Sequence, residues 1–387
     1  MRQLADTLTS FELQPHPEIL AGTAYPEVDT ATRAALAQRH QVPRWPAWPA
    51  FMSWSVARWP SWPQTLAPIL SRLTLFWLRR PIHQWQISRR AVEQVGVWLA
   101  ATDSAEALNW DQREERDRRL AELGLDDDDR DPAAVLRLVV TRGSDAAPDM
   151  ARTYLERLLS NTGIRHIESV VVSPGILPRL EPGLFADLVA RAMIYEHRDE
   201  PFGTSLAVTR GYGLRGPSGL FPSAPGRAGF DTLFEADEDV ALGLLGQFCR
   251  VASEQWCLQQ RQRGLTPRPV RLELPDGPIE LWGDQHVFKW SRGVLGPHIL
   301  TSLLLAADQW LAAQVAAGRP LAELVAKTLR AGSLVAVAGP VIAAGIDRNQ
   351  VQADLAVMLP LMCSPRLWFY DLARWLEDER ATAHGIG

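Results

Sequence analysis

The chain has 387 residues, of which 47% are hydrophobic and 22% are charged, and its formal net charge is −5. This composition is that of a folded globular protein and excludes a disordered or low-complexity chain. The acidic balance excludes a protein that binds polyanions over its whole surface. The length predicts about two or three domains.

The cysteines and the apolar runs indicate the compartment. Cys249, Cys257 and Cys363 are too few for a disulfide framework and have no Cys-x-x-Cys spacing for a metal. They are typical of reduced thiols in a cytosolic protein. No signal-peptide pattern opens the sequence, and the longest apolar run, residues 334–346, is too short to span a bilayer. We therefore expect a cytoplasmic protein with no membrane association and no metal or cofactor.

Residues 31–92 have an unusual composition, with nine arginines, seven tryptophans and no Asp or Glu. Four Trp-Pro pairs interrupt the first half of this segment, which favours extended or turn backbone over a continuous helix. Helices are predicted to follow at 64–78 and 88–100.

The arginines and tryptophans of this segment have two interpretations. In the first, which the acidic total charge favours, the rings are buried between helices and the arginines lie in solvent. In the second, they form a cationic aromatic face that binds nucleic acid or an acidic protein. The residues assigned to such a face are close in the sequence: Arg79, Arg80, Trp85, Arg89 and Arg90.

An acidic run at 126–131 follows a predicted charged helix at 112–123. The run lacks the alternating Asp or Asn, the central glycine and the final Glu of a calcium loop, so we interpret it as a solvated loop and helix cap. We place a domain boundary there, between an Arg/Trp-rich N-terminal helical region, residues 1–125, and a C-terminal region, residues 132–387.

The C-terminal region is predicted to be an array of short helices. Apolar residues recur at the helical period in the segments 132–141, 148–161, 166–172, 182–197, 237–262, 300–311, 321–329, 334–346 and 351–362. Helices this short cannot bury their apolar stripes alone, so they must stack on one another.

One segment of this region does not follow the helical period. At 270–282, apolar and polar residues alternate on both sides of a Pro-Asp-Gly turn, which predicts a β-hairpin. The predicted fold class is therefore all-α, with short helices stacked as in an α-solenoid or HEAT-like array and one β-hairpin near 270–282.

The glycine-rich motifs do not predict a nucleotide site. Gly211-Tyr-Gly-Leu-Arg-Gly216 matches the dinucleotide pattern, but several prolines follow from Pro217, so no helix can open at its last glycine. The chain contains no Gly-x-x-x-x-Gly-Lys-Ser/Thr phosphate loop. We therefore predict neither a dinucleotide module nor an NTP-binding module.

One candidate catalytic cluster can be assembled from two carboxylates and two imidazoles: Glu280, Asp284, His286 and His298. Carboxylates near tryptophans are typical of sites that process sugars, so an enzyme acting on a polar, carbohydrate-like substrate is one alternative. No metal-binding His-x-x-x-His or His-Glu-x-x-His spacing accompanies them. The interpretation we favour is that these are side chains of a hairpin edge and a core.

Four short motifs in the C-terminal region carry a resemblance. They are Gly219-Leu-Phe-Pro222, Leu274-Pro-Asp-Gly277 with Trp282-Gly283, Ser302-Leu-Leu-Leu-Ala-Ala-Asp-Gln-Trp-Leu311, and Ser333-Leu-Val-Ala-Val-Ala338. Through them, residues 217–378 resemble the helical region of very large bacterial NTPases of anti-phage defence loci. Because this chain has no NTP-binding module, the resemblance does not imply ATPase activity. It implies a helical platform for sensing, scaffolding or partner binding.

These observations together favour a non-enzymatic protein. We predict a helical scaffold or sensor that binds a protein partner, as part of a bacterial phage-defence system. Nucleic acid is a second candidate partner, through residues 31–92.

Overall fold

The computed structural model describes residues 13–15, 17–21, 29–39, 42–43, 48–78, 85–105, 132–161, 164–195, 211–293, 295–347 and 355–373. The chain divides into two compact units: unit 1 is Met1–Tyr154 with Gly175–Leu177, and unit 2 is Leu155–Pro174 with Pro178–Gly387. The division falls inside a helix. The charged helix predicted at 112–123 and the acidic loop at 126–131 lie outside the described residues, so the domain boundary placed there stays a prediction.

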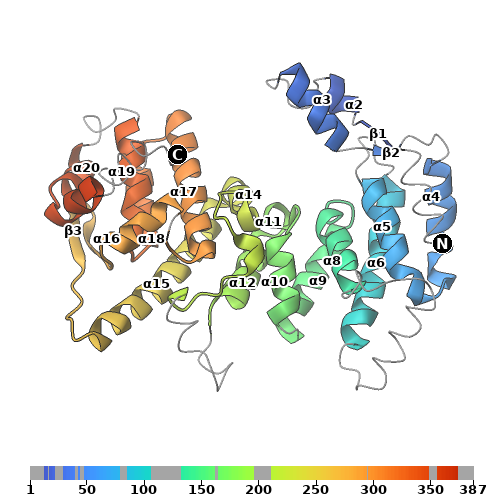
Figure 1. Cartoon of the computed structure of the whole chain (residues 1–387), viewed down its shortest axis with the longest axis horizontal. Helices are drawn as coiled ribbons and strands as arrows, with labels where there is room; N and C mark the ends of the chain where they lie inside the picture. The colour runs from blue at the N-terminus through green and yellow to red at the C-terminus, as the bar shows by residue number, and fades with distance from the viewer. Residues whose placement is uncertain are drawn as a thin grey trace. The chain divides into compact units, whose positions relative to one another are not determined.

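Helices make up most of the described residues, which confirms the all-α prediction (Figure 1). The strands in the described part of the chain form two short antiparallel pairs. One is the predicted hairpin, in which β3 (Val270–Leu274) pairs with β4 (Gly277–Leu281). The other was not predicted and joins two residues of β1 (Leu13–Gln14) to two of β2 (Val42–Pro43).

Unit 1 is built around three helices that pack on one another. Its helices are α2 (Pro17–Ala21), α3 (Thr30–Arg39), α4 (Trp48–Val56), α5 (Ala67–Leu78), α6 (Trp85–Ala105), α8 (Pro132–Arg142) and the first half of α9 (Pro148–Asn161). The mutually packed helices are α5, α6 and α8, and α4 packs against α6. Trp59, Trp77 and Leu99 are among the fully buried side chains of this core.

The Trp-Pro pairs of unit 1 are more helical than predicted. Trp48 and Pro49 open α4, where an extended or turn segment was expected. Proline is tolerated there because the first turn of a helix leaves its N–H groups without partners in any case. Trp59 and Pro60 likewise begin a short 3-10 helix.

Unit 2 contains the predicted array of short helices and the hairpin. Its α-helices are α10 (Ile164–Val172), α11 (Leu177–Leu180), α12 (Pro182–Met193), α14 (Phe230–Ala236), α15 (Glu238–Gln262), α16 (Gln285–Phe288), α17 (His298–Ala316), α18 (Leu321–Ala331), α19 (Ala338–Asp347) and α20 (Leu355–Met362). Residues 365–373 are also helical. Short 3-10 segments lie at Ser218–Leu220, Arg227–Gly229, Lys289–Arg292 and Val335–Val337.

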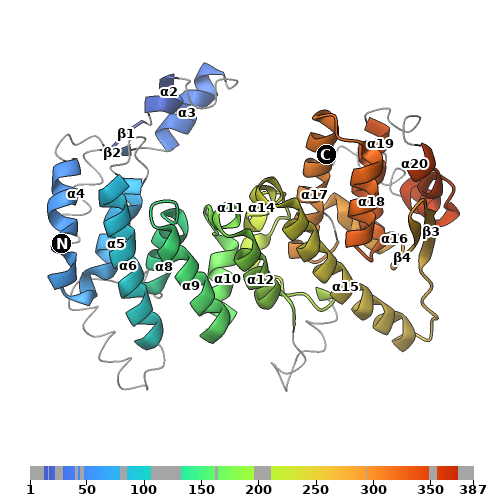
Figure 2. The ribbon, with the colours of Figure 1, turned by 180° about the vertical axis from the view of Figure 1, so that it is seen from behind.

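The helices of unit 2 stack both on helices that are close in the sequence and on helices further along the chain. The packed pairs include α10 with α12, α12 with α15, α14 with α17, α17 with α19, and α18 with α19. α17, α18 and α19 stand beside one another in both ribbon views, and the long helix α15 runs along this unit (Figures 1 and 2). Stacking buries the apolar stripe predicted at 300–311, since Leu300, Leu303, Leu304 and Leu311 are all inaccessible.

The start of α15 follows from its capping residue. The Asp237 side chain accepts hydrogen bonds from the backbone N–H groups of Asp239 and Val240. An aspartate at this position satisfies N–H groups that the first turn leaves without partners. This fixes the beginning of the helix that carries the site described below.

α17 is also notable for its composition. Among the described residues it is the one helix long and apolar enough to cross a bilayer by length and composition. Most of that apolar stretch is buried inside unit 2. The same pattern is typical of the core helix of a globular unit.

A candidate binding groove in unit 2

Of the four residues of the predicted catalytic cluster, Asp284 and His298 are held by described partners. Asp284 caps α16: its Oδ1 accepts the Val287 N–H at 3.1 Å, and its Oδ2 accepts the Trp256 Nε1–H at 3.3 Å. These contacts give the Asp284 carboxylate a structural role at the start of a helix.

The two histidines lie in separate surroundings. His298 Nδ1 lies 3.0 Å from Ser223 Oγ, and its ring meets the Phe221 ring edge-on with centroids 5.2 Å apart. His286 is exposed on α16. Within the described part of the chain, no hydrogen bond or ion pair joins any two of Glu280, Asp284, His286 and His298. The contacts of Asp284 and His298 are therefore with residues outside the cluster.

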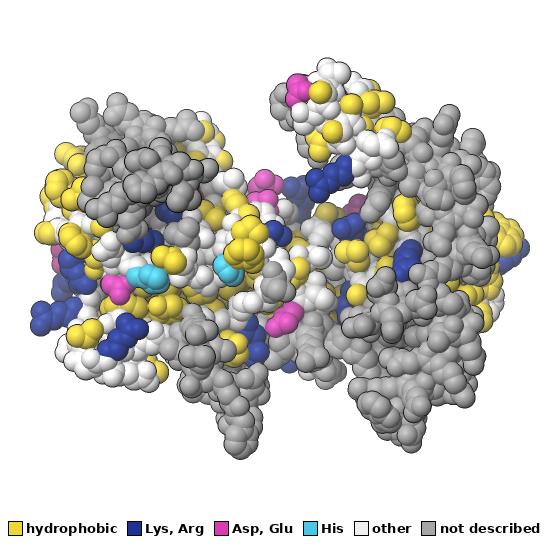
Figure 3. All heavy atoms as spheres, in the orientation of Figure 1, with side chains coloured by type: hydrophobic (Ala, Val, Ile, Leu, Met, Phe, Trp, Pro, Cys, Tyr) yellow, Lys and Arg dark blue, Asp and Glu magenta, His cyan; other side chains and the backbone are white. Residues whose placement is uncertain are grey.

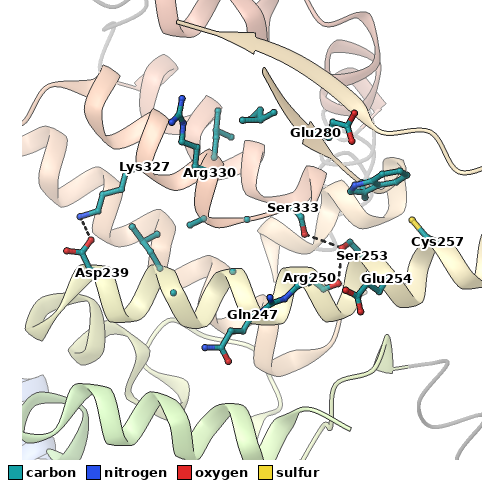
Figure 4. Close-up of a pocket in the computed structure, with 18 of the residues that line it drawn as sticks. Asp239, Gln247, Arg250, Ser253, Glu254, Cys257, Glu280, Lys327, Arg330 and Ser333 are labelled. Carbon is teal, nitrogen blue, oxygen red and sulfur yellow. Dashed lines mark hydrogen bonds and ion pairs between the residues drawn. The ribbon is translucent and has the colours of Figure 1, made fainter. Parts of the chain in front are cut away.

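Glu280 lines a large groove, which we call the α15 groove. Its cavity volume is about 1080 Å³, and three parts of unit 2 form its walls (Figure 4). One wall is a face of α15 from Asp239 to Arg261. The second is the end of the hairpin at Ile279, Glu280 and Trp282, and the third is the end of α18 with the residues up to Ser333.

One end of the groove is lined by residues of a network of ion pairs. Lys327 Nζ lies 2.7 Å from Asp239 Oδ1 and also binds Glu238, which accepts two further hydrogen bonds from Arg319. Hydrogen bonds from Arg319 and then Lys327 outweigh the opposing effect of burial and lower the pKa of Glu238 from 4.5 to about 2. Lys327 is therefore neutralised by its neighbours.

The middle of the groove contains charged side chains without such partners. Arg250 and Glu254 lie on α15, and Glu280 lies on the hairpin (Figure 4). All three are exposed, and none of their side chains has a hydrogen bond or ion pair with another described residue. Between them, Ser253 Oγ and Ser333 Oγ join α15 to the segment after α18 at 3.1 Å.

The one thiol in the groove is not activated. Cys257 is half-buried, and burial is the main reason that its pKa is raised above the usual value, with Glu254 acting in the same direction. A raised pKa lowers the fraction of thiolate, which is the nucleophilic form. The α15 groove is therefore better suited to binding than to thiol chemistry.

The shape of the groove depends on two glycines of α15 for which no role was predicted from the sequence. A side chain added at Gly243 would meet open space, so this position leaves the groove wide. A Cβ at Gly246 would lie 2.5 Å from the Ala331 carbonyl oxygen, so only glycine allows α15 and the end of α18 to approach this closely. Two glycines three residues apart on one helix face are the signal that could have indicated the groove.

The predicted arginine face of unit 1 is described only in part. Arg79 and Arg80 lie outside the described residues. Trp85 is 50% exposed at the start of α6, and Arg90 is exposed. Arg89, however, forms an ion pair with Glu93 through Nε at 2.8 Å. The acid that neutralises Arg89 thus lies one position beyond the acid-free segment.

The tryptophans of that segment divide between the two interpretations. Trp59 and Trp77 are buried in the core of unit 1, and Trp77 Nε1 donates a hydrogen bond to Ser88 Oγ at 2.9 Å. Trp54 and Trp85 are each 50% exposed. The first interpretation therefore holds for Trp59 and Trp77, whereas Trp54 and Trp85 leave aromatic surface exposed.

Neither a metal site among the described residues nor a similar known protein indicates what the groove binds. In the described part of the chain, no group of three or more His, Cys, Asp and Glu side chains is placed to hold a metal ion. The sequence matches no protein-family model, and no curated protein is significantly similar to it. The role of the α15 groove therefore has to be argued from its own residues.

Proposed function

We propose that this chain is a non-enzymatic helical scaffold that binds a segment of a protein partner in the α15 groove. The observation that carries the proposal is an open groove in which the charged side chains of Arg250, Glu254 and Glu280 have no hydrogen-bond or ion-pair partner among the described residues. Opposite charges on a partner would pair with these side chains. Such complementarity favours a specific partner over non-specific adhesion.

The enzyme alternative has less support. A carbohydrate-processing site of the usual kind needs two carboxyl groups that share one substrate, with an acid and a base or nucleophile role. Asp284 is occupied as a helix cap, so the predicted pair of Glu280 and Asp284 is not free to share a substrate. Glu254 lies in the groove with Glu280, but no described hydrogen bond positions either carboxyl group. A sequence of helices with a charged groove is the arrangement expected of a binding platform.

We also propose phage defence as the setting of this scaffold. The support is the resemblance of residues 217–378 to the helical region of defence NTPases. The proposed scaffold would then act in the cytoplasm, beside a protein partner.

The first prediction is tested by affinity capture from cells of the native host, with partners identified by mass spectrometry. Arg250→Glu reverses an exposed, unpaired charge of the groove, so we expect it to reduce recovery of a partner by about tenfold, the loss of roughly one good charge pair. Arg191→Glu is the matched control, since Arg191 is an exposed arginine on α12 outside the groove. Equal recovery by the Arg250→Glu protein and the unchanged protein would contradict the assignment of the groove.

A further inference from the structure

One edge of the strand β4 faces away from β3. The register of the hairpin determines which backbone N–H and C=O groups lie on this edge. In an antiparallel pair, successive residues point their backbone N–H and C=O groups alternately toward the partner strand and away from it. Pro278, opposite Glu273, has no N–H to donate and fits the set that points away. Trp282 also points away, because its N–H donates to Ser333 and its C=O accepts from Val335.

Glu280 lies between these two residues and therefore belongs to the same outward set. Its N–H and C=O, together with the C=O of Pro278, form the free edge of β4. The outward groups of Trp282 are already used by the segment 333–335, which runs parallel to β4 at this point. No other described segment bonds to the outward groups of Glu280 or Pro278.

This free edge opens into the α15 groove. Ile279, Glu280 and Trp282 line the groove together with Gly332 and Ser333. The backbone is extended at Gly332 and Leu334, with φ near −112° and −106°. The segment that pairs with Trp282 leaves the edge of β4 where it joins the end of α18, so Glu280 remains exposed beside it.

The charges along the edge indicate what kind of segment it accepts. Asp276 in the hairpin turn lies 3.4 Å from Arg330, so β4 starts at the Arg330 side of the groove and runs toward Trp282. Lys327 is already neutralised by Glu238 and Asp239, and Arg330 is paired with Asp276. Arg250 and Arg261 line the groove from α15, and neither has an ion pair with a described residue. In the middle of the groove, the available cation is therefore Arg250.

From this geometry we infer that the partner segment binds as an added β-strand along the free edge of β4 and carries an acidic side chain that faces Arg250. The inference rests on the proposed function and specifies its mode of binding. Strand addition gives affinity through backbone hydrogen bonds and specificity through alternate side chains. The edge offers one donor, at Glu280, and two acceptors, at Glu280 and Pro278. Pro278 limits pairing to a short strand, which is how edge strands avoid open-ended association.

The second prediction uses a displayed library of random dodecapeptides selected on the full-length protein. We expect the selected peptides to contain Asp or Glu, and we would measure their Kd as synthetic peptides. Glu280→Pro removes the outward N–H and should raise Kd by about tenfold. Glu280→Gln keeps that N–H and removes only the charge that Glu280 presents to the groove, so it should change Kd less than Glu280→Pro does.

The control variant is Arg271→Pro. Arg271 is opposite Glu280, so its N–H also points away from the ladder, but on the other edge of the hairpin. Both proline variants therefore lose an outward N–H and place proline at equivalent positions of the two strands. We expect Arg271→Pro to leave Kd unchanged, and circular dichroism melting would show whether either variant fails to fold.

A second measurement needs no change in the protein. N-methylation of single amides along the selected peptide should weaken binding at two positions that are two residues apart, because the edge offers two acceptors and only alternate amides of an added strand face β4. If methylation shows no such alternation, or if Glu280→Pro binds as tightly as the unchanged protein while Arg250→Glu does not, the groove binds peptides but strand addition is wrong. If neither Glu280→Pro nor Arg250→Glu weakens any selected peptide, the proposed function fails as well.

Discussion

At the residue scale, Trp310 shows how far a pattern in the sequence determines burial. Trp310 belongs to the predicted stripe of α17, is 6% exposed, and stacks on Phe234 with ring centroids 5.3 Å apart. We predict that Trp310→Ala lowers the free energy of unfolding by about 3–5 kcal/mol, the usual cost of deleting a buried large aromatic side chain. Urea unfolding followed by circular dichroism measures this change.

The matched control for this substitution is Trp368→Ala. Trp368 is 69% exposed, so its removal should change the unfolding free energy by less than about 0.5 kcal/mol. If both variants unfold at the same urea concentration as the unchanged protein, Trp310 does not anchor a core.

Burial of individual tryptophans could be predicted only where a helical period exists. The spacing of Leu303, Ala307 and Trp310 predicts one face, and that face is buried. In unit 1 the composition is uniform, so the sequence does not distinguish buried Trp59 from half-exposed Trp85. Which ring is covered depends on the helices packed nearby, and these come from distant parts of the chain.

At the element scale, the ion pairs at the start of α15 predict a pH-dependent stability. The pKa of Glu238 is lowered from 4.5 to about 2, so the carboxylate stabilises the folded state above pH 4.5. This contribution should be lost as the pH falls from about 4.5 toward about 2. Because the side chain is 23% exposed and partly screened by solvent, we expect an effect on the order of 1 kcal/mol.

Glu238→Gln should remove this contribution at pH 5 and have a much smaller effect near pH 2, which urea unfolding at the two pH values would show. Glu235→Gln is a suitable control, because the Glu235 ion pair with Arg179 is 67% and 63% exposed and should contribute little. A Glu238→Gln protein with the same loss of stability at both pH values would contradict the role of the carboxylate charge.

Single elements could be predicted well, and the site between them could not. The bounds of α9 are those predicted, Pro148–Asn161, and the hairpin lies where the alternation around its turn placed it. These features depend on residues that are neighbours in the sequence. The α15 groove depends on three segments that are far apart in the sequence, so no local sequence pattern predicts it. Asp284 was assigned to a candidate catalytic cluster because of its residue type, whereas its carboxylate caps α16.

At the scale of the whole molecule, charge distribution favours one of the two candidate partners. The net charge is −5, and on the face seen in Figure 3 basic side chains occur in small groups among acidic and apolar ones. Nucleic-acid binding needs several cations that release counterions together. A groove in which one acidic peptide segment pairs with few arginines needs far fewer cations. The charge distribution therefore favours the protein partner.

The last prediction concerns single-stranded nucleic acid and the face at the start of α6. Arg89 is neutralised by Glu93, so Arg90 and the ring of Trp85 remain as exposed contributors among the described residues of this face. One or two phosphate contacts and one stacked base give weak, salt-sensitive affinity. We therefore expect fluorescence anisotropy to detect binding of a labelled oligo(dT) at about 20 mM salt and none at about 150 mM salt. Arg89→Glu with Arg90→Glu should remove the low-salt binding. Binding that persists at the higher salt concentration and is lost in this double variant would make nucleic acid a partner of unit 1.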